Sequence, residues 1–509
     1  MKKHCRAWLR RKAKKAARRL RVAKGGQAPR KGGRELAPGA IRYETSDRVQ
    51  AIPCGGLGVV HSLVRRVGLA EIIDDRLPIL MSRRPYSESD HVLNIAYNIL
   101  CGGAVLDDIE VRRSDVAFLD AVGARRIPDP TTAGDFCRRF SAEQIETLMD
   151  LLNEIRQSVW RRQPATFLAQ TAKIDADGSV VPTRGECKHG IGLSYNGIWG
   201  YHPLVVSLSN TGEPLFVANR SGNRPSQEGA PDYFARAIEV VRGAGFRDVL
   251  LRGDTAFSQA AHFDRWTADG VRFVFGYDAV KQLVEKAEAV PDTEYTELRR
   301  KADEALDRKA RTKQPRVKEA IISERGYRNL RLEREEIAEF EHKPTRAKGT
   351  YRIVVLCKSI IEERGQIAIG HRDRYFFFVT NDRSLSAEEV VREANTRCNQ
   401  ENLIEQLKNG VRSLRAPLNT LEANWAYMVM ASLAWSLKAW VALWPASTRR
   451  WRAKHQAERE RILKMEFRSF LQRVILVPAQ ILKTGRSVVY RLLSWRPELP
   501  ILFRVLDAL

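Results

Sequence analysis

The sequence is poor in cysteine: its 509 residues contain seven, and no two of them form a Cys-x-x-Cys pair. So few cysteines exclude a disulfide framework, and the missing pairs exclude the common zinc ribbons. The segment Cys187-Lys188-His189 has no second pair of ligands, so we expect no zinc there. The composition predicts a reduced, cytoplasmic chain.

Long apolar runs are also scarce, and only residues 424–444 approach the length of a membrane span. Lys438 interrupts this run, and Ser432 and Ser436 dilute it. Because the rest of the chain is polar, we expect a helix buried against a sheet and no membrane partner. A membrane helix is the alternative.

Acidic residues are missing from the first 34 positions, which carry 15 lysines and arginines. The whole chain has 86 Lys and Arg against 61 Asp and Glu, a net charge of +25. Because neutralisation of phosphates by such side chains drives nucleic-acid affinity, we expect a polyanionic partner. Residues 1–40 lack the apolar core of a secretory signal, and we interpret them as a basic, disordered tail. A transit peptide is the alternative, and the lack of serine weakens it.

Apolar spacing predicts helices through residues 41–165, which we interpret as a helical DNA-binding region with arginines on its surface. The expected helices span 56–67, 89–100, 132–140 and 142–160. Asp129-Pro130 is a start signal for the third of them. Arginine pairs on helices are also typical of ordinary solvated faces, so the binding role depends on the rest of the chain.

From residue 166 the pattern changes to strands that alternate with helices, which predicts an α/β sheet. The expected strands are 167–177, 249–251, 271–277, 351–360 and 374–380, with a hairpin at 192–209. This core is split into 166–280 and 350–445 by a charged insertion at 281–349. Residues 446–509 predict a basic, helical C-terminal region.

Acidic residues follow two of the expected strands. Asp175 and Asp177 end the first and share one face, because they are two residues apart. Asp254 ends the second, where ligand sites of α/β sheets gather. Such carboxylates suit two divalent ions in phosphoryl transfer. A lone aspartate at a strand end is more often a cap, so position alone leaves both interpretations open.

A long helix is expected from Ser386 to Gly410, beginning with a capping box. Arg397, Glu401 and Lys408 are four and seven residues apart and therefore share one face of it. That face combines a carboxylate with two cations that suit phosphate. Arg397 and Glu401 also match an ordinary ion pair across one helical turn.

The segments around these residues resemble the DDE transposases of bacterial insertion sequences, over roughly residues 85–440. The similar segments are Asp177-Gly178-Ser179, Tyr195-Asn196-Gly197, Gly200-Tyr201-His202-Pro203-Leu204, Arg220-Ser221-Gly222-Asn223 and Arg252-Gly253-Asp254-Thr255-Ala256-Phe257. The helix resembles the family signature Tyr-x2-Arg-x3-Glu-x6-Lys, with Arg397, Glu401 and Lys408 in matching places. Ala394 occupies the position of the tyrosine. The resemblance implies that this tyrosine helps to bind DNA near the cleaved end, so we expect altered DNA contacts there.

The resemblance implies an RNase H-like mixed sheet flanked by helices, with an inserted, largely β subdomain and helical N- and C-terminal regions. It implies that Asp177, Asp254 and Glu401 are catalytic and bind two Mg²⁺, with Mn²⁺ as a substitute. Arg397 and Lys408 would bind DNA phosphates. The implied activity is metal-dependent cleavage of DNA followed by strand transfer.

Asp175 is the rival of Asp177, which we prefer because a small hydroxyl residue, Ser179, follows it. The implied partners are double-stranded DNA, as inverted repeats and as target, and a second copy in a homodimer. The expected location is the bacterial cytoplasm, at the nucleoid. The rival functions are an inactive, transposase-derived DNA-binding protein and an RNase H-like nuclease without strand transfer.

Three aromatic residues near the expected site, Trp199, Trp266 and Tyr277, are expected in the core, with stacking on an unpaired base as the alternative. His189 and His202 are expected to hydrogen-bond within the hairpin rather than to bind metal.

Overall fold

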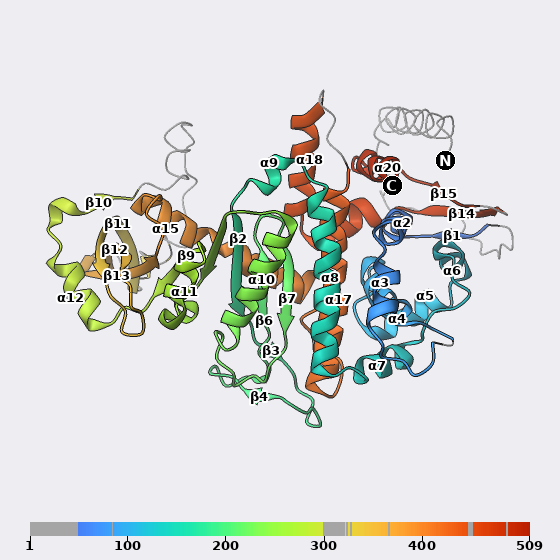
Figure 1. Ribbon diagram of the computed structural model, residues 1–509, viewed down its shortest axis with the longest axis horizontal. Coiled ribbons are helices and arrows are strands. Elements are labelled where there is room, and N and C mark those ends of the chain that lie inside the picture. The colour runs from blue at the N-terminus through green and yellow to red at the C-terminus, as the bar shows by residue number, and fades with distance from the viewer. Residues whose placement is uncertain are drawn as a thin grey trace.

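The computed structural model describes residues 49–83, 85–298, 321, 324–325, 328–364, 367–445, 451–484 and 487–509. The basic tail at 1–40 lies outside these residues, and so does part of the expected insertion. Figure 1 shows a central sheet, with a strand ribbon on one side and a helical part on the other. The fold is mixed α/β, as expected.

A nine-stranded mixed sheet organises the molecule, with the strand order β10-β11-β12-β13-β9-β8-β2-β6-β7. Its strands are β2 (Ala172–Gly178), β6 (Leu204–Leu208), β7 (Glu213–Ala218), β8 (Val249–Gly253), β9 (Arg272–Tyr277), β10 (Thr296–Glu297), β11 (Arg328–His342), β12 (Tyr351–Arg364) and β13 (Ile367–Thr380). Strands β2, β8 and β9 run parallel, and all other neighbours are antiparallel. The carboxyl ends of β2, β8 and β9 therefore meet at one edge.

The first strand is shorter than expected from its apolar run. Residues 165–168 form a short helix, α9 (Ala165–Leu168), and β2 begins only at Ala172. Short apolar runs do not distinguish a buried helical turn from a strand, which explains the error.

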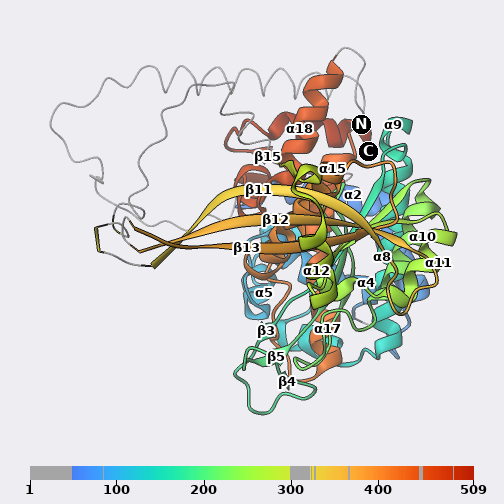
Figure 2. The same cartoon turned by 90° about the vertical axis from the view of Figure 1, so that its left-hand side faces the viewer.

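The expected insertion is not separate from the core sheet. Strand β11 pairs with β12 along its whole length, and β13 in turn pairs with β9 of the core. Figure 2 shows β11, β12 and β13 as a long, twisted ribbon that runs out from the body of the molecule. The charged segment 281–349 also contributes helix α12 (Lys281–Ala289), so its described part extends the core sheet and adds a helix. Its status as a separate subdomain stays a prediction.

The four expected N-terminal helices are present as α2 (Leu57–Val67), α4 (Glu88–Leu100), α7 (Pro130–Arg138) and α8 (Ala142–Arg161). The structure adds three shorter helices that were not predicted, α3 (Leu69–Arg76), α5 (Ile109–Arg113) and α6 (Val116–Val122). Helix α7 begins as its sequence predicts, because the Asp129 carboxylate accepts the Thr132 backbone N–H at 2.9 Å and Pro130 occupies the first turn.

The C-terminal region is not all helical, contrary to expectation. Its helices are α18 (Arg452–Lys464), α19 (Phe467–Phe470) and α20 (Leu499–Ala508), and between them lie strands β14 (Ala479–Thr484) and β15 (Ser487–Leu492). Strand β14 also pairs with β1 (Ala51–Ile52), from the other end of the chain. The β-branched and aromatic run Val488-Val489-Tyr490 favours a strand and was the local sequence evidence for β15. Tyr490 also donates its hydroxyl to the Ala121 carbonyl at 2.8 Å.

The apolar run at 424–444 is a helix of the protein core. It belongs to α17 (Leu421–Leu443), which contacts β7, α4, α8 and α18. Within the part of the chain that the structure describes, α17 is the one helix long and apolar enough to cross a membrane, and its apolar window is entirely buried in protein. Burial between the sheet and the helical part accounts for its composition.

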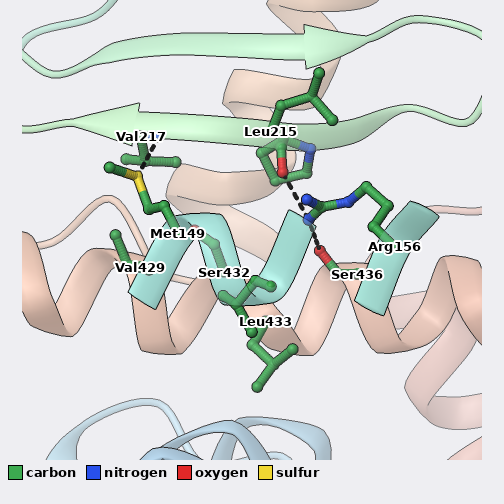
Figure 3. A pocket seen from close by; sticks show the side chains of 10 residues that line it. Met149, Arg156, Leu215, Val217, Val429, Ser432, Leu433 and Ser436 are labelled. Carbon is green, nitrogen blue, oxygen red and sulfur yellow. Dashed lines mark hydrogen bonds between the residues drawn. The ribbon is translucent and has the colours of Figure 1, made fainter. Parts of the chain in front are cut away.

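A buried ion pair joins α8 and α17 to the sheet. Arg156 donates to Glu213 at 3.1 Å and to the Ser436 hydroxyl at 3.0 Å, a contact that Figure 3 shows. The indoles of Trp160 and Trp440 donate to the same Glu213 carboxylate at 2.9 and 2.8 Å. The cavity beside Arg156 measures about 20 Å³, the space of one water, so this cluster stabilises the fold and holds no ligand.

Candidate active site

The two aspartates of β2 have different surroundings. Asp175 is 1% exposed, and both of its oxygens accept from Arg252, at 2.7 and 2.8 Å. Asp177 lies nearer the carboxyl end of β2 and keeps part of its side chain in solvent. A buried carboxylate held by two charge-assisted hydrogen bonds is a structural group, and this difference favours Asp177 as the functional one.

Arg252 also extends from the sheet to the helix above it. Its guanidinium donates to the Glu393 carboxylate at 2.9 Å, to the Thr396 hydroxyl at 2.7 Å and to the Ser209 hydroxyl at 2.9 Å. Lys173 makes a second ion pair with Glu393 at 2.6 Å. These bonds hold the end of helix α15 (Ala387–Thr396) against β2 and β8.

The long helix expected over 386–410 is broken at Arg397. It consists of α15, α16 (Cys398–Glu405) and a π-helical segment over 406–410. The Thr396 hydroxyl donates to the Glu393 carbonyl at 2.9 Å, while the Arg397 N–H turns to the Ala394 carbonyl at 3.4 Å. Because a side chain competes for the helical carbonyl, the helix ends one residue before Arg397.

Helix α16 is docked on the sheet by a residue that the sequence did not single out. Gln400 is buried, donates to the Val205 carbonyl at 2.8 Å and accepts a hydrogen bond from the Ser207 hydroxyl. Both partners belong to β6, the neighbour of β2. This contact brings Glu401, the next residue along α16, to the side of the sheet where β2 ends.

Asp254 caps the turn that follows β8. Its carboxylate accepts the Ala256 backbone N–H at 2.9 Å, so the capping role considered for a strand-end aspartate is present here. The same side chain also acts on Asp177. Burial and, next, the negative charge of Asp254 raise the pKa of Asp177 to about 6, while Arg397 opposes the shift.

Arg397 connects the strand-end carboxylate to the helix. Its guanidinium nitrogens lie 3.8 Å from Asp177 Oδ2 and 3.8 Å from Glu401 Oε1. Burial lowers the pKa of Lys408, and the charge of Asp177 acts against that change. Arg397 therefore contacts both Asp177 and Glu401 at the end of β2, and Asp254 and Lys408 lie close enough to interact electrostatically with Asp177.

In the structure, the three carboxylates do not converge closely enough to coordinate one metal ion. Among the described residues no three His, Cys, Asp or Glu side chains lie close enough together to enclose a metal ion. Asp177 and Asp254 form a pair of like charges, whereas the Glu401 side chain is 59% exposed and contacts Arg397. Two neighbouring carboxylates that repel each other favour a bound cation, because it removes that repulsion.

The glycine after Asp177 is required by close packing. A Cβ on Gly178 would lie 2.8 Å from His202 Nε2 and 2.9 Å from Ser226 Oγ. His202 is buried, and its Nδ1 lies 2.7 Å from the Arg224 carbonyl oxygen, which agrees with the hydrogen-bonding role expected for it. Arg220 donates to carbonyl groups of the same loop, including that of Glu228.

The three aromatic residues expected in the core behave differently. Trp266 is buried, as predicted, but Trp199 is 55% exposed on the hairpin between β4 (Gly192–Leu193) and β5 (Trp199–Tyr201). The prediction for Trp199 was wrong, because it lies on a strand of three residues in a small sheet, β3-β5-β4, that is separate from the central sheet. Tyr277 is half-buried at the end of β9.

Comparison with known proteins gives a family and a distant likeness to solved structures. No curated protein matches the sequence. Among solved structures, the chain is similar to the piggyBac transposase in a cryo-EM synaptic complex with hairpin DNA. The identity is 10% and the TM-score 0.35, over 83% of this chain and 79% of that chain.

The family model for the transposase DDE domain, group 1, matches residues 51–509. The matched range includes every strand of the central sheet and both strands that join the two ends of the chain. This protein therefore belongs to the DDE transposase family.

Proposed function

We propose that this transposase cuts the inverted ends of a bacterial insertion sequence and joins them to target DNA, using an RNase H-like core. The observation that carries the proposal is the convergence of Asp177, Asp254, Arg397 and Glu401 at the end of β2. The RNase H-like assignment is supported by strand direction: β2, β6 and β7 are antiparallel, and β8 and β9 then run parallel to β2.

Asp177, Asp254 and Glu401 would hold two Mg²⁺, for which Mn²⁺ is a substitute. The donors are all carboxylate oxygens, the ligands that Mg²⁺ prefers, and the charge repulsion at Asp177 fits a site that is completed by cations. Two such ions, when bound, stabilise the attacking and leaving oxygens of phosphoryl transfer. Glu401 would turn from Arg397 toward the aspartates, which its exposure and its place on α16 allow.

Arg397 and Lys408 would bind the phosphates of the DNA strand. Arg397 lies between two of the carboxylates, so a phosphate that enters the site gives its guanidinium a new anionic partner. The arginines of the N-terminal helices and the basic C-terminal region would bind the inverted repeats. Two copies on two DNA ends, in the bacterial nucleoid, would form the active complex.

The test is cleavage of labelled duplex carrying the inverted repeat, with Mg²⁺ and with EDTA. We expect nicking at the repeat boundary that requires metal and is lost in Glu401→Gln, with binding of the end retained. Glu405→Gln is the matched control, because Glu405 lies one turn along α16 and bonds only Asn409 among the described hydrogen bonds. Retained cleavage in Glu401→Gln would contradict the assignment.

A second candidate, an inactive transposase-derived DNA-binding protein, is favoured by Ala394. The signature tyrosine is missing there, and Ala394 packs against the apolar cluster of Leu250 and Val274 under α15. Binding without cleavage under Mg²⁺ and Mn²⁺ would establish this candidate. Cleavage without joining of the cut end would instead indicate a nuclease.

A further inference from the structure

Two cysteines that are 47 residues apart in the sequence touch inside the helical part of the molecule (Figure 1). Cys54 lies between β1 and α2, and Cys101 directly follows the last residue of α4. Their side chains are buried, at 1% and 4% exposure, and the Cys101 thiol donates to Cys54 Sγ at 3.1 Å. Among the described cysteines, which are all free thiols, no other two share a hydrogen bond.

The two backbones hold these thiols close to the separation of a disulfide. Because a disulfide bond measures about 2.0 Å, the two sulfurs need to approach by only about 1 Å. The Gly55 N–H, next to Cys54, donates to the Val477 carbonyl at 2.8 Å. On the other side, the Arg112 guanidinium donates to the Cys101 carbonyl at 2.7 Å. The contact between the thiols is therefore supported by the fold on both sides.

The surroundings make the two thiols unequal. The hydrogen bond from Cys101 lowers the pKa of Cys54, and the charge of Arg112 acts in the same direction, while burial and Asp115 oppose them. Burial, and then the same hydrogen bond, raise the pKa of Cys101. Because the thiolate is the nucleophile in exchange with disulfides, Cys54 is the thiol suited to attack and Cys101 the one suited to follow.

The pair lies just beneath the surface. Pro53, the residue before Cys54, is exposed, and so is Gly102, the residue after Cys101. A small reagent therefore needs only a local displacement of either segment to reach the sulfurs, and not unfolding of the chain. Cys187 and Cys398 are already exposed, so they should react faster than this pair.

We propose that Cys54 and Cys101 form a redox-active dithiol that low-molecular-weight disulfides convert into an intramolecular disulfide. The Cys54 thiolate attacks one sulfur of the small disulfide, forms a mixed disulfide and releases one thiolate. Cys101 then gives up its proton and attacks Cys54 Sγ, which displaces the second thiolate. Two protein thiols are oxidised and the small disulfide is reduced to two thiols, which take up the two protons.

The new bond would join the start of the described chain to the end of α4. Helix α4 packs against α17, and β1 pairs with β14, so the bond would tie the seam between the two chain ends to the helical core. A cross-link between residues this far apart stabilises a fold, mainly by restricting the unfolded chain. In a reducing compartment the pair stays as thiols, so the bond would form only when small disulfides accumulate. This chemistry needs neither DNA nor metal.

The test is oxidation of the folded, full-length protein with oxidised glutathione. After the reaction is quenched with acid, the chain is unfolded, its remaining thiols are blocked and its unreduced peptides are identified by mass spectrometry. We expect peptides linked through Cys54 and Cys101 as the main cross-linked product, and a melting temperature several degrees above that of the reduced protein. Dithiothreitol should reverse both changes. Cys137→Ser is the matched control, because Cys137 is buried without a cysteine partner, and it should oxidise as wild type does.

Single variants separate the roles of the two thiols. Cys101→Ala should accumulate a mixed disulfide of glutathione at Cys54 and show no rise in melting temperature, because the second thiol is missing. Cys54→Ala should leave Cys101 as a thiol. Wild type decides the matter even if a variant fails to fold. If Cys187 and Cys398 react with glutathione while Cys54 and Cys101 remain thiols, the proposal is wrong. It is also wrong if the linkage forms only in urea.

Discussion

At the scale of single residues, Arg252 has the strongest positioning role among the groups near the candidate site. It is 1% exposed and joins Asp175 of β2 to Glu393 and Thr396 of α15. Arg397 is the residue that follows Thr396, so the direction of α16 depends on this contact. Among the described contacts Arg252 reaches none of the proposed metal ligands, so it acts through the helix that it holds.

Replacing Arg252 separates stability from function. Arg252→Met should lower the free energy of unfolding by about 3–5 kcal/mol, because Asp175 is left as an unpaired buried charge. The double variant Asp175→Leu/Arg252→Met should recover most of that loss, since Glu393 keeps Lys173. Cleavage should stay at least tenfold reduced in the double variant, because α15 is no longer held.

The measurement is a thermal melt beside the cleavage assay for each protein. Recovery of both stability and cleavage in the double variant would show that Arg252 has a purely structural role. Arg252→Lys should resemble Arg252→Met in cleavage, because an ammonium group lacks the planar fork that binds Asp175 and reaches Thr396.

Lys438 is a second residue whose surroundings predict a measurable effect. It is 1% exposed in α17, donates to the Leu463 carbonyl at 2.9 Å and lies over the Trp435 ring. Burial lowers the pKa of its ammonium group to about 7. Between pH 7 and about 10 the unfolded chain therefore binds one more proton than the folded chain, and stability rises with pH.

Lys438→Met removes this dependence. Relative to wild type, the variant should be most stable at or below pH 7, and its advantage should shrink as pH rises, by about 1.4 kcal/mol per pH unit at most. Urea unfolding at pH 7, 8 and 9 measures the difference, with Lys281→Met as the control because the Lys281 side chain is 90% exposed. A difference that does not change with pH would contradict the burial argument.

At the scale of elements, the two ends of the described chain form one unit. Strand β1 pairs with β14, and the start of α2 packs against the segment between α19 and β14. A Cβ on Gly56 would lie 2.1 Å from the Val474 carbonyl oxygen, a backbone atom that cannot move alone. Glycine is needed there because two backbones approach closely, and not because of an unusual φ.

Gly56→Ala should therefore destabilise the protein, with a melting temperature several degrees lower, because the added methyl group pushes the N- and C-terminal regions apart. Gly370→Ala is the control: that glycine lies in the β13 strand with no atom within 4 Å of its Cβ position. Differential scanning calorimetry measures both variants. Equal melting temperatures for the two would show that the ends are not tightly joined.

At the scale of the whole molecule, the distribution of charge predicts the affinity for DNA and its dependence on salt. Residues 1–34 carry 15 basic residues and no acid, and the rest of the chain has a net charge of +10. Counterion release makes affinity fall with salt in proportion to the number of phosphates neutralised. The tail should therefore add affinity without adding sequence preference.

Removing residues 1–40 should weaken binding to random-sequence DNA by tenfold or more at low salt. It should also reduce the slope of log affinity against log salt, because fewer phosphates are neutralised. The ratio of affinities for the inverted repeat and for random DNA should remain the same or increase. Fluorescence anisotropy across a salt series measures these quantities, and an unchanged slope would contradict a DNA-binding tail.

Local sequence was sufficient where the signal lies within a few residues. Apolar spacing predicted α2, α4, α7 and α8, and the turn Asn196-Gly197 predicted the hairpin that contains it. Helix periodicity predicted that Arg397 and Glu401 share one side of the helix, and Glu401 Oε1 lies 3.8 Å from the Arg397 guanidinium. Their roles in chemistry, like that of Asp254, stay predictions.

Tertiary structure decided what depends on partners far along the chain. Asp175 and Asp177 are alike in sequence, and only Arg252, 77 residues away from Asp175, pairs with the first of them. The break before Arg397 comes from side chains that compete for a carbonyl, and the pairing of β1 with β14 joins opposite ends of the chain. Hydrogen bonds between distant segments do not change the apolar periodicity of either segment. Such partners are therefore determined only by how the segments pack in the folded chain.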